Sequence, residues 1–109
     1  MATKFVIELI IKAGGIPVIA HPSLLETDNL IPELISEGVM GIEAWYPTHS
    51  KSQVEKYLEI AKKYKLVPTG GSDSHGTRPG YPKIGEFTVP YNALEELIEI
   101  KNQCTEYSR

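Results

Sequence analysis

The stretch "VMGIEAWY", residues 39–46, decides the fold. It is rich in β-branched and aromatic side chains, and Glu43 is its only charged residue. Such a run is typical of a strand buried in a parallel sheet. Ser50 and Gln53 follow with the spacing of a capping box, and residues 51–64 then carry apolar side chains at helical spacing. The sequence therefore predicts a strand followed by a helix.

The same alternation appears before this unit. Residues 4–13 have helical spacing and stop at Gly14-Gly15, and "IPVIAH" (16–21) is a short β-branched run that predicts a buried strand. Residues 27–37 predict a second helix, closed by Gly38. Pro32 is compatible with that helix only if it lies in the first turn.

It continues after this unit as well. "LVPTG" (66–70) predicts a third strand, and "IGEFTV" (84–89) is compatible with a final one. Asn92, with Glu95 three residues later, predicts the start of a last helix.

This order predicts an α/β fold in which parallel strands near 16–21, 39–45 and 66–70 alternate with helices. An open doubly wound sheet and part of a (β/α) barrel both fit the order. Three or four strands are too few to close a barrel, which normally needs about eight. The chain also starts on a helix, so it resembles the inside of a larger repeating fold.

Composition excludes several classes of protein. The chain has 109 residues, 41% hydrophobic and 23% charged, with a net charge of −3 and no basic run, so it lacks the footprint of a nucleic-acid binder. Cys104 is the single cysteine, which excludes an internal disulfide framework and predicts a reducing, cytoplasmic location. The apolar stretches are too short to span a bilayer, so no membrane association is expected.

Polar side chains follow each predicted strand. His21 ends the first strand, His49 lies in the loop after the second, and Asp73 and His75 follow the third. In both candidate geometries the loops after parallel strands form one rim, where functional residues collect. Imidazole and carboxylate together suit zinc, iron or manganese. Asp73 and His75, joined by His21, therefore predict a site for divalent metal.

Each of these residues also has a structural interpretation. His21 is equally compatible with a partly buried ring satisfied by backbone groups, and the position of His49 before a helix cap favours exposure to solvent. Arg78 is compatible with a surface loop or with a phosphate contact. Tyr46 is compatible with simple packing. The motifs of a nucleophile elbow, a Walker phosphate loop and a dinucleotide-binding loop are all missing from the sequence.

Three segments, "GGIPVIAHP", "GIEAWYPTHS" and "LVPTGGSDSHG", resemble in order and spacing the C-terminal portion of the PHP domain, the polymerase and histidinol phosphatase superfamily. The resemblance covers about residues 5 to 100. It implies part of a distorted TIM-like (β/α)7 barrel with a cluster of divalent metals at the carboxyl ends of its strands. The implied activity is a metal-dependent phosphoesterase that hydrolyses phosphoester bonds in nucleotides or short oligonucleotides with metal-activated water.

The resemblance also assigns roles to residues. His21, Asp73 and His75 match metal ligands, with manganese, zinc or iron as the implied ions. His49 matches a histidine that the resemblance assigns to the phosphate of a phosphorylated small molecule or short oligonucleotide substrate, and Arg78 is a second candidate for that role.

The family's H-x-H motif, which lies near the start of the PHP domain, is absent here. Residues 1–109 are therefore expected to form a single partial PHP domain, the C-terminal half, with low activity alone. The alternative is a non-catalytic half-domain that binds a partner chain or self-associates. A half-barrel has open edges, so we expect association with the complementary N-terminal half or with a second copy. Candidates for the exposed apolar surface are Val18, Ile42 and Val67.

Overall fold

The computed structural model describes residues 2–25 and 28–107, together with the side chains of all of these except residues 2, 25 and 104–107. The predicted helix start at Thr27 and the surroundings of the Cys104 side chain lie outside the described parts. The elements are, in chain order, α1 (Ala2–Lys12), β1 (Val18–Ile19), α2 (Pro22–Leu25), the 3₁₀ turn η1 (Asp28–Leu30), α3 (Ile31–Ser36), β2 (Gly41–Trp45), α4 (Lys51–Tyr64), β3 (Val67–Gly70) and α5 (Tyr91–Tyr107).

The three strands form one parallel sheet in the order β1-β2-β3. Val18 pairs with Gly41, which in turn pairs with Val67, so the three strands are aligned at their start. Between Glu43 and Trp45 the register shifts by an irregularity in the ladder. The predicted α/β class with parallel strands is confirmed, and each strand lies within its predicted segment.

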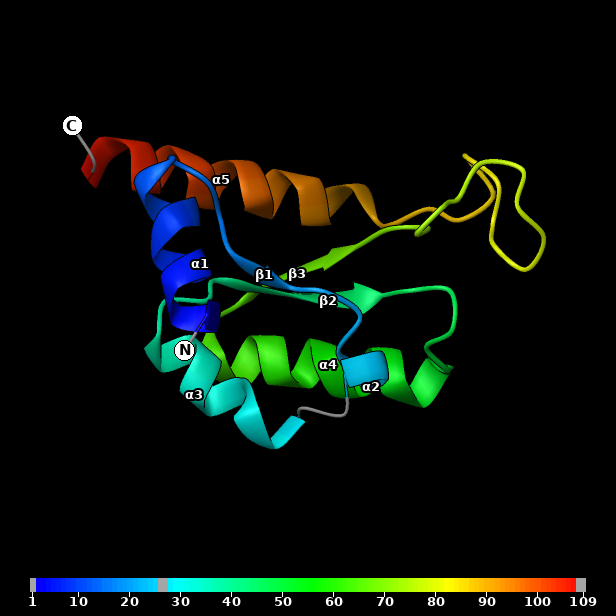
Figure 1. The fold of residues 1–109 in the computed structure, drawn as a ribbon, viewed down its shortest axis with the longest axis horizontal. Coiled ribbons are helices and arrows are strands. Elements are labelled where there is room, and N and C mark those ends of the chain that lie inside the picture. The colour runs from blue at the N-terminus through cyan, green and yellow to red at the C-terminus, as the bar shows by residue number, and fades with distance from the viewer. Residues whose placement is uncertain (1, 26–27, 108–109) are drawn as a thin grey trace.

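Helices cover both faces of this sheet. Figure 1 shows α5 on one face, with α3 and α4 on the other, and α1 beside the amino ends of the strands. The carboxyl ends of the strands point to the opposite side of the molecule, where the loop between β3 and α5 extends away from the body (Figure 1). This layering leaves the carboxyl edge of the sheet for a site formed by loops.

The hydrophobic core lies between β2 and the α3–α4 layer. Ile42 and Ala44 of β2 point into it and are fully buried, because alternate residues of a strand face the same side. The other buried members are Ile7, Ile19, Ile31, Val39, Tyr57, Ala61 and Leu66. Of the residues expected on an exposed apolar surface, Ile42 and Val67 are buried, at 0% and 4% exposure, and only Val18 is half-buried. That expectation is wrong for the first two because helices pack on both faces of the sheet.

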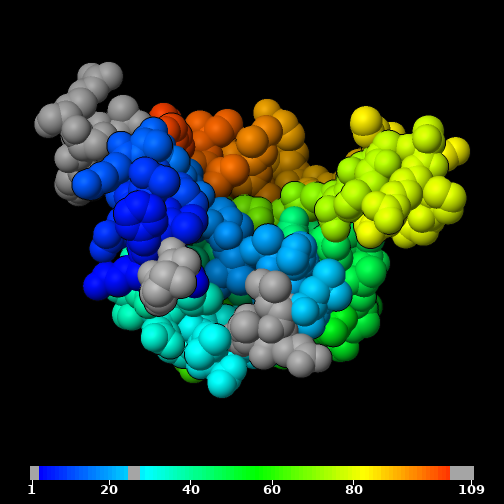
Figure 2. All heavy atoms as spheres, viewed as in Figure 1, coloured from blue at the N-terminus to red at the C-terminus, as the bar shows by residue number. Residues whose placement is uncertain are grey.

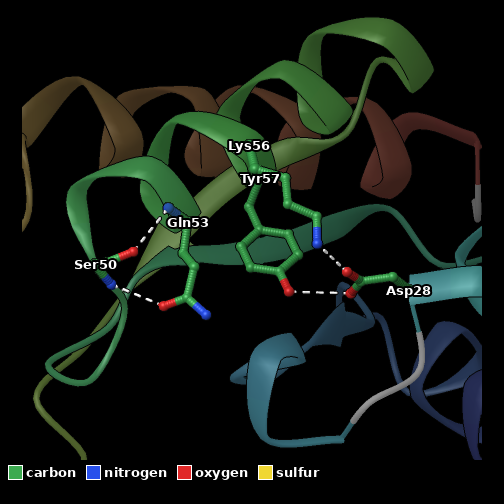
Figure 3. A network of polar contacts seen from close by, with 5 residues as sticks. All are labelled: Asp28, Ser50, Gln53, Lys56 and Tyr57. Atoms are coloured by element: carbon green, nitrogen blue, oxygen red, sulfur yellow. Dashed lines mark hydrogen bonds and ion pairs between the residues drawn. The ribbon is translucent and has the colours of Figure 1, made fainter.

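Helix α4 begins as its sequence predicts. The Ser50 hydroxyl accepts a hydrogen bond from the Gln53 amide at 3.2 Å, and the Gln53 side chain accepts one from the Ser50 amide at 2.8 Å (Figure 3). The helix ends at Lys65, which adopts a left-handed conformation with φ 57°. This capping box fixes the path of the chain from β2 into α4 and so the position of the loop that carries His49.

The sequence interpretation fails for one strand. Residues 84–89 form turns and irregular backbone instead of a strand. Gly85 has φ 89°, a left-handed conformation, and the Glu86 amide donates to the Lys83 carbonyl at 3.1 Å to close a turn. A turn therefore takes the place of the strand with which the segment is compatible.

Two helix boundaries also differ from the expected ones. The segment predicted as one helix over 27–37 contains the 3₁₀ turn η1 and the six-residue helix α3, with Pro32 in the first turn of α3 as expected. Helix α5 begins at Tyr91, so Asn92 lies inside its first turn instead of capping it. Among the described residues, no helix combines the length and the apolar character that crossing a membrane requires.

Candidate metal centre

His21 and Glu43 meet at the carboxyl edge of the sheet. His21 follows β1, and its backbone amide donates a hydrogen bond of 2.8 Å to Oε1 of Glu43 in β2. Glu43 points to the face opposite Ile42 and Ala44, toward the loop that follows β3, because a Cβ placed on Gly71 would lie 3.5 Å from its Oε2. The carboxylate thus holds the turn in which His21 lies.

Tyr46 joins the same edge to Asp73. Its hydroxyl donates a hydrogen bond of 2.5 Å to Oδ2 of Asp73, and its ring centroid lies 5.5 Å from that of His21. The hydrogen bond to the Asp73 carboxylate, with burial of the ring, raises the pKa of Tyr46 to about 12. Tyr46 therefore stays protonated at neutral pH and positions one oxygen of Asp73.

The backbone is strained at two of the predicted ligands. His21 has φ 25° and Asp73 has φ 50°, and non-glycine residues rarely adopt positive φ. Each such residue costs on the order of 1 kcal/mol, and these conformations cluster at functional sites. Nδ1 of His21 is buried and has no hydrogen-bond partner among the described residues. An imidazole nitrogen in this state is a candidate metal ligand.

His75 is exposed and lies in a small cluster within the loop between β3 and α5. Its Nδ1–H donates to the Asp73 carbonyl at 2.7 Å, which leaves the lone pair on Nε2 of the neutral ring, the form that binds metals. Tyr81 lies against this ring at a centroid distance of 3.7 Å. The Arg78 guanidinium lies 5.5 Å from the Tyr81 centroid and is also exposed. Asp73 thus links the His75 cluster to Tyr46.

The side chains of His21, Asp73 and His75 are of the types that bind divalent metals, but they do not come together as one group of three. Among the side chains that the structure describes, no three of His, Cys, Asp or Glu are grouped to hold an ion. His21 has an open nitrogen, Asp73 has a carboxylate with one oxygen held by Tyr46, and His75 has the required tautomer. These are mixed nitrogen and oxygen donors, which zinc, iron and manganese accept.

His49 is buried at 8% exposure, and the expectation of solvent exposure is wrong. Its Nδ1–H donates to the Ala44 carbonyl at 2.8 Å, and its ring lies between Tyr46 at 5.4 Å and Tyr57 at 5.1 Å. Its Nε2 is buried without a partner among the described residues, so the neutral ring offers one open acceptor. The two tyrosine rings explain the burial.

Tyr57, whose ring contacts His49, also belongs to a network of polar contacts with Asp28 and Lys56 (Figure 3). Asp28 of η1 accepts a hydrogen bond of 3.0 Å from the Tyr57 hydroxyl and forms an ion pair with Lys56. Burial and this hydrogen bond raise the pKa of Tyr57 to about 12. Burial acts to raise the pKa of Asp28, but the hydrogen bonds from Lys56 and Tyr57 outweigh it and hold that pKa below its ordinary value. The group ties η1 to α4.

Sequence reasoning missed the role of Tyr46, which it interpreted as packing. The signal that could have found it is its position at the end of the strand that carries Glu43, on the rim where His21 and Asp73 were expected. The hydrogen bond from the His21 amide to Glu43 joins residues 22 positions apart, so local sequence pattern does not reveal it.

The structure thus combines a parallel α/β sheet with imidazole and carboxylate side chains at the carboxyl edge of its strands. Comparison with known proteins adds a reaction class. The chain is 39% identical over 84 residues to a phosphoribosyl 1,2-cyclic phosphate 1,2-diphosphodiesterase of Eggerthella lenta, covering 77% of this chain and 32% of that protein. It is 32% identical over 81 residues to a 3',5'-nucleoside bisphosphate phosphatase of Chromobacterium violaceum, covering 70% and 28%.

The fold matches as well. A crystal structure from Bifidobacterium adolescentis, described as a metal-dependent phosphoesterase, superimposes with a TM-score of 0.73 and 31% identity, covering 88% of this chain and 35% of that one. No family model matches the chain. The chain spans about a third of the length of the curated relatives that it matches, 32% and 28%. The chain is thus related to PHP-like phosphoesterases, as its resemblance to the PHP domain indicates.

Proposed function

We propose that this chain carries part of the active site of a metal-dependent phosphoesterase that acts on nucleotides or short oligonucleotides. One observation carries the proposal: Tyr46 and Glu43 hold Asp73 and His21 at the same edge of the sheet, in strained backbone conformations. The related phosphodiesterase, phosphatase and phosphoesterase support the reaction class.

The metal ligands in this proposal are His21, Asp73 and His75, with manganese, zinc or iron as the ion. A bound divalent ion supplies positive charge that stabilises phosphoryl oxygens and lowers the pKa of water. Glu43 keeps the turn at His21 in place through the amide hydrogen bond, and the Tyr46 hydroxyl holds one oxygen of Asp73. These two residues therefore orient donors that would otherwise move with their loops.

Arg78 and His49 are proposed to contact substrate phosphate. Arg78 is exposed, and a guanidinium is suited to bidentate contact with phosphate. Because Nδ1–H of His49 already donates to the Ala44 carbonyl, a contact with a phosphate oxygen requires a second proton, on Nε2, and the ring is enclosed by Tyr46 and Tyr57. The related proteins are named for a ribosyl cyclic phosphate and a nucleoside bisphosphate, so a phosphorylated nucleoside or ribose is the proposed substrate class.

We further propose that residues 1–109 correspond to the C-terminal half of a PHP domain, part of a TIM-like (β/α)7 barrel. A complete metal cluster then needs ligands from outside these residues, because the described ones do not group three donors. Low activity of the chain alone is the consequence.

A chimera tests this function. In the Eggerthella lenta relative, the matched 84 residues are replaced by the corresponding segment of this chain, and hydrolysis of the relative's own cyclic phosphate substrate is measured with manganese. We expect the chimera to be active and Asp73→Ala to lower its kcat at least about a hundredfold. Glu99→Ala, an exposed carboxylate on α5, serves as the matched control and is expected to keep the activity.

A folded chimera without activity would support the alternative of a non-catalytic half-domain instead. Equal activity of the Asp73→Ala chimera and its parent would show that the proposed ligand does not take part. Circular dichroism of each chimera establishes that it is folded before either conclusion is drawn.

A further inference from the structure

Four aromatic rings form a continuous row from the middle of α4 to the carboxyl edge of the sheet. The His49 ring lies between two tyrosines, with its centroid 5.1 Å from that of Tyr57 and 5.4 Å from that of Tyr46. The Tyr46 ring in turn lies 5.5 Å from the ring of His21, a proposed metal ligand. The rings are tilted against one another, at distances that aromatic pairs favour. We call these four residues the ring row.

Three members of the ring row are buried. Tyr57 is 1% exposed, Tyr46 is 6% exposed and His49 is 8% exposed. Protein interiors are packed as closely as organic crystals, so a buried ring cannot shift unless its neighbours adjust. A displacement of the Tyr57 ring is therefore expected to reach Tyr46 through His49.

Hydrogen bonds hold the ring row at both ends and in the middle. The Tyr57 hydroxyl donates to Oδ1 of Asp28 at 3.0 Å (Figure 3). The Tyr46 hydroxyl donates to Oδ2 of Asp73 at 2.5 Å. The His49 ring donates to one backbone carbonyl of β2 at 2.8 Å, and its other nitrogen is without a partner among the described residues. Because one hydrogen bond leaves a ring free to tilt, the two tyrosine rings beside it hold its orientation.

Asp28 lies apart from the carboxyl edge. It belongs to η1, in the connection between β1 and β2, and forms an ion pair with Lys56 of α4. The Lys56 ammonium also lies 5.2 Å from the centroid of the Tyr57 ring. Figure 2 shows the cyan segment around η1 and the yellow loop after β3 at separate parts of the surface. Asp28 is thus linked to the candidate metal centre through Tyr57 and the ring row.

We propose that Asp28 and Tyr57 are positioning residues of the candidate metal centre, acting through the ring row on the carboxylate of Asp73. Without the bond to Asp28, the Tyr57 ring loses the contact that holds its outer end, and the rings of His49 and Tyr46 follow its shift. The hydrogen bond from Tyr46 to Asp73 is then distorted, and hydrogen bonds weaken steeply as their geometry departs from the optimum. The proposal rests on the proposed function, because it takes Asp73 as a metal ligand.

Nuclear magnetic resonance on the metal-free chain tests the positioning directly. The readout is the ¹³C signal of Cζ in Tyr46, which responds to the hydrogen bond of the attached hydroxyl. Asp28→Asn weakens the bond that anchors the ring row, and Tyr57→Phe removes it without a change of charge. The matched controls are Glu33→Gln, at an exposed residue of α3, and Tyr64→Phe, at the last residue of α4.

We expect Asp28→Asn and Tyr57→Phe to shift the Tyr46 signal, and both controls to leave it in place. His49→Gln replaces the imidazole by a flexible side chain and so interrupts the ring row. In that background, Asp28→Asn and Tyr57→Phe should have no further effect on the signal, because residues that are not in contact are coupled only through those that join them. Circular dichroism verifies that each variant is folded.

Manganese affinity measures the consequence for the site. We expect Asp28→Asn and Tyr57→Phe each to weaken Mn²⁺ binding about threefold, as residues that act at a distance do, and His49→Gln to abolish this difference. An unchanged Tyr46 signal in both variants, equal shifts in the controls, or shifts that persist in full beside His49→Gln would overturn the proposal. Unchanged affinity in both variants of a parent that binds the ion would overturn it too. A parent that binds no Mn²⁺ would contradict the proposed function, whereas the Tyr46 signal, measured without metal, still decides the positioning.

Discussion

Tyr46→Phe removes one hydroxyl from the centre of the candidate site and leaves the ring. The hydroxyl donates to Oδ2 of Asp73 at 2.5 Å, while the ring lies against His21 and His49 at 5.5 and 5.4 Å. The substitution therefore separates the hydrogen bond from the packing. It leaves the Asp73 carboxylate without the donor that positions it in a loop where φ is 50°.

The pKa of Tyr46 sets the size of the effect. A hydrogen bond to a carboxylate contributes about 1.5–3 kcal/mol, and the raised pKa, about 12 in place of 10.0, means that the parent loses about 2.7 kcal/mol of unfolding free energy when Tyr46 ionises, partly through burial of the ring. Asp73 is exposed, so solvent screening reduces this value to about 1–2 kcal/mol. Because the pKa is raised in the folded state, the stabilisation is fully present below pH 10.0 and is lost as the pH rises toward about 12.

Urea unfolding of the parent chain and of Tyr46→Phe measures this difference at neutral pH and at several pH values above 10. We expect the variant to be less stable by about 1–2 kcal/mol at neutral pH, and the difference to shrink at high pH. Tyr91→Phe, at an exposed residue at the start of α5, is the control and should change neither quantity. A Tyr46→Phe variant as stable as the parent, or a deficit independent of pH, would refute the role of this hydrogen bond.

Two further substitutions test the support of the site. Ser50→Ala removes the cap of α4 and should lower the free energy of unfolding, measured in urea, by about 1 kcal/mol. Lys51→Ala, at an exposed residue of the same turn, is the control and should leave this free energy unchanged. Equal losses in the two variants would contradict the capping box. Asp28→Asn should lower the free energy of unfolding by about 1 kcal/mol at neutral pH. This is less than a buried charged hydrogen bond contributes, because the ion pair with Lys56 is partly exposed. Since the pKa of Asp28 is lowered on folding, this deficit should disappear as the pH falls below 3.8, and a deficit that persists in acid would count against the pair.

The strands and α4 could be predicted because their sequences carry local signals. Buried parallel strands are short apolar runs, as at 39–46, and a capping box marks the start of α4. The segment 84–89 also contains β-branched and aromatic residues, but a strand needs a neighbour, and Gly85 takes a left-handed turn there. Local pattern alone does not distinguish these two cases.

The rim at the carboxyl edge followed from topology, since consecutive parallel strands end on one side. The contacts within it did not. The hydrogen bond between Glu43 and the His21 amide and the one between Tyr46 and Asp73 join residues 22 and 27 positions apart, and two of these residues, His21 and Asp73, have positive φ. His49 is buried because Tyr57, from the next helix, lies across its ring, a contact that sequence spacing does not indicate.

Manganese binding to the chain tests the central claim most directly, that His21 and Asp73 form part of a metal site. Titration followed by the electron paramagnetic resonance signal of free Mn²⁺ gives the affinity without any activity measurement. We predict that the parent chain binds the ion, that His21→Ala and Asp73→Ala each weaken binding by about tenfold or more, and that Glu99→Ala does not. Manganese binding of equal strength in all four proteins, or in none of them, would contradict the claim.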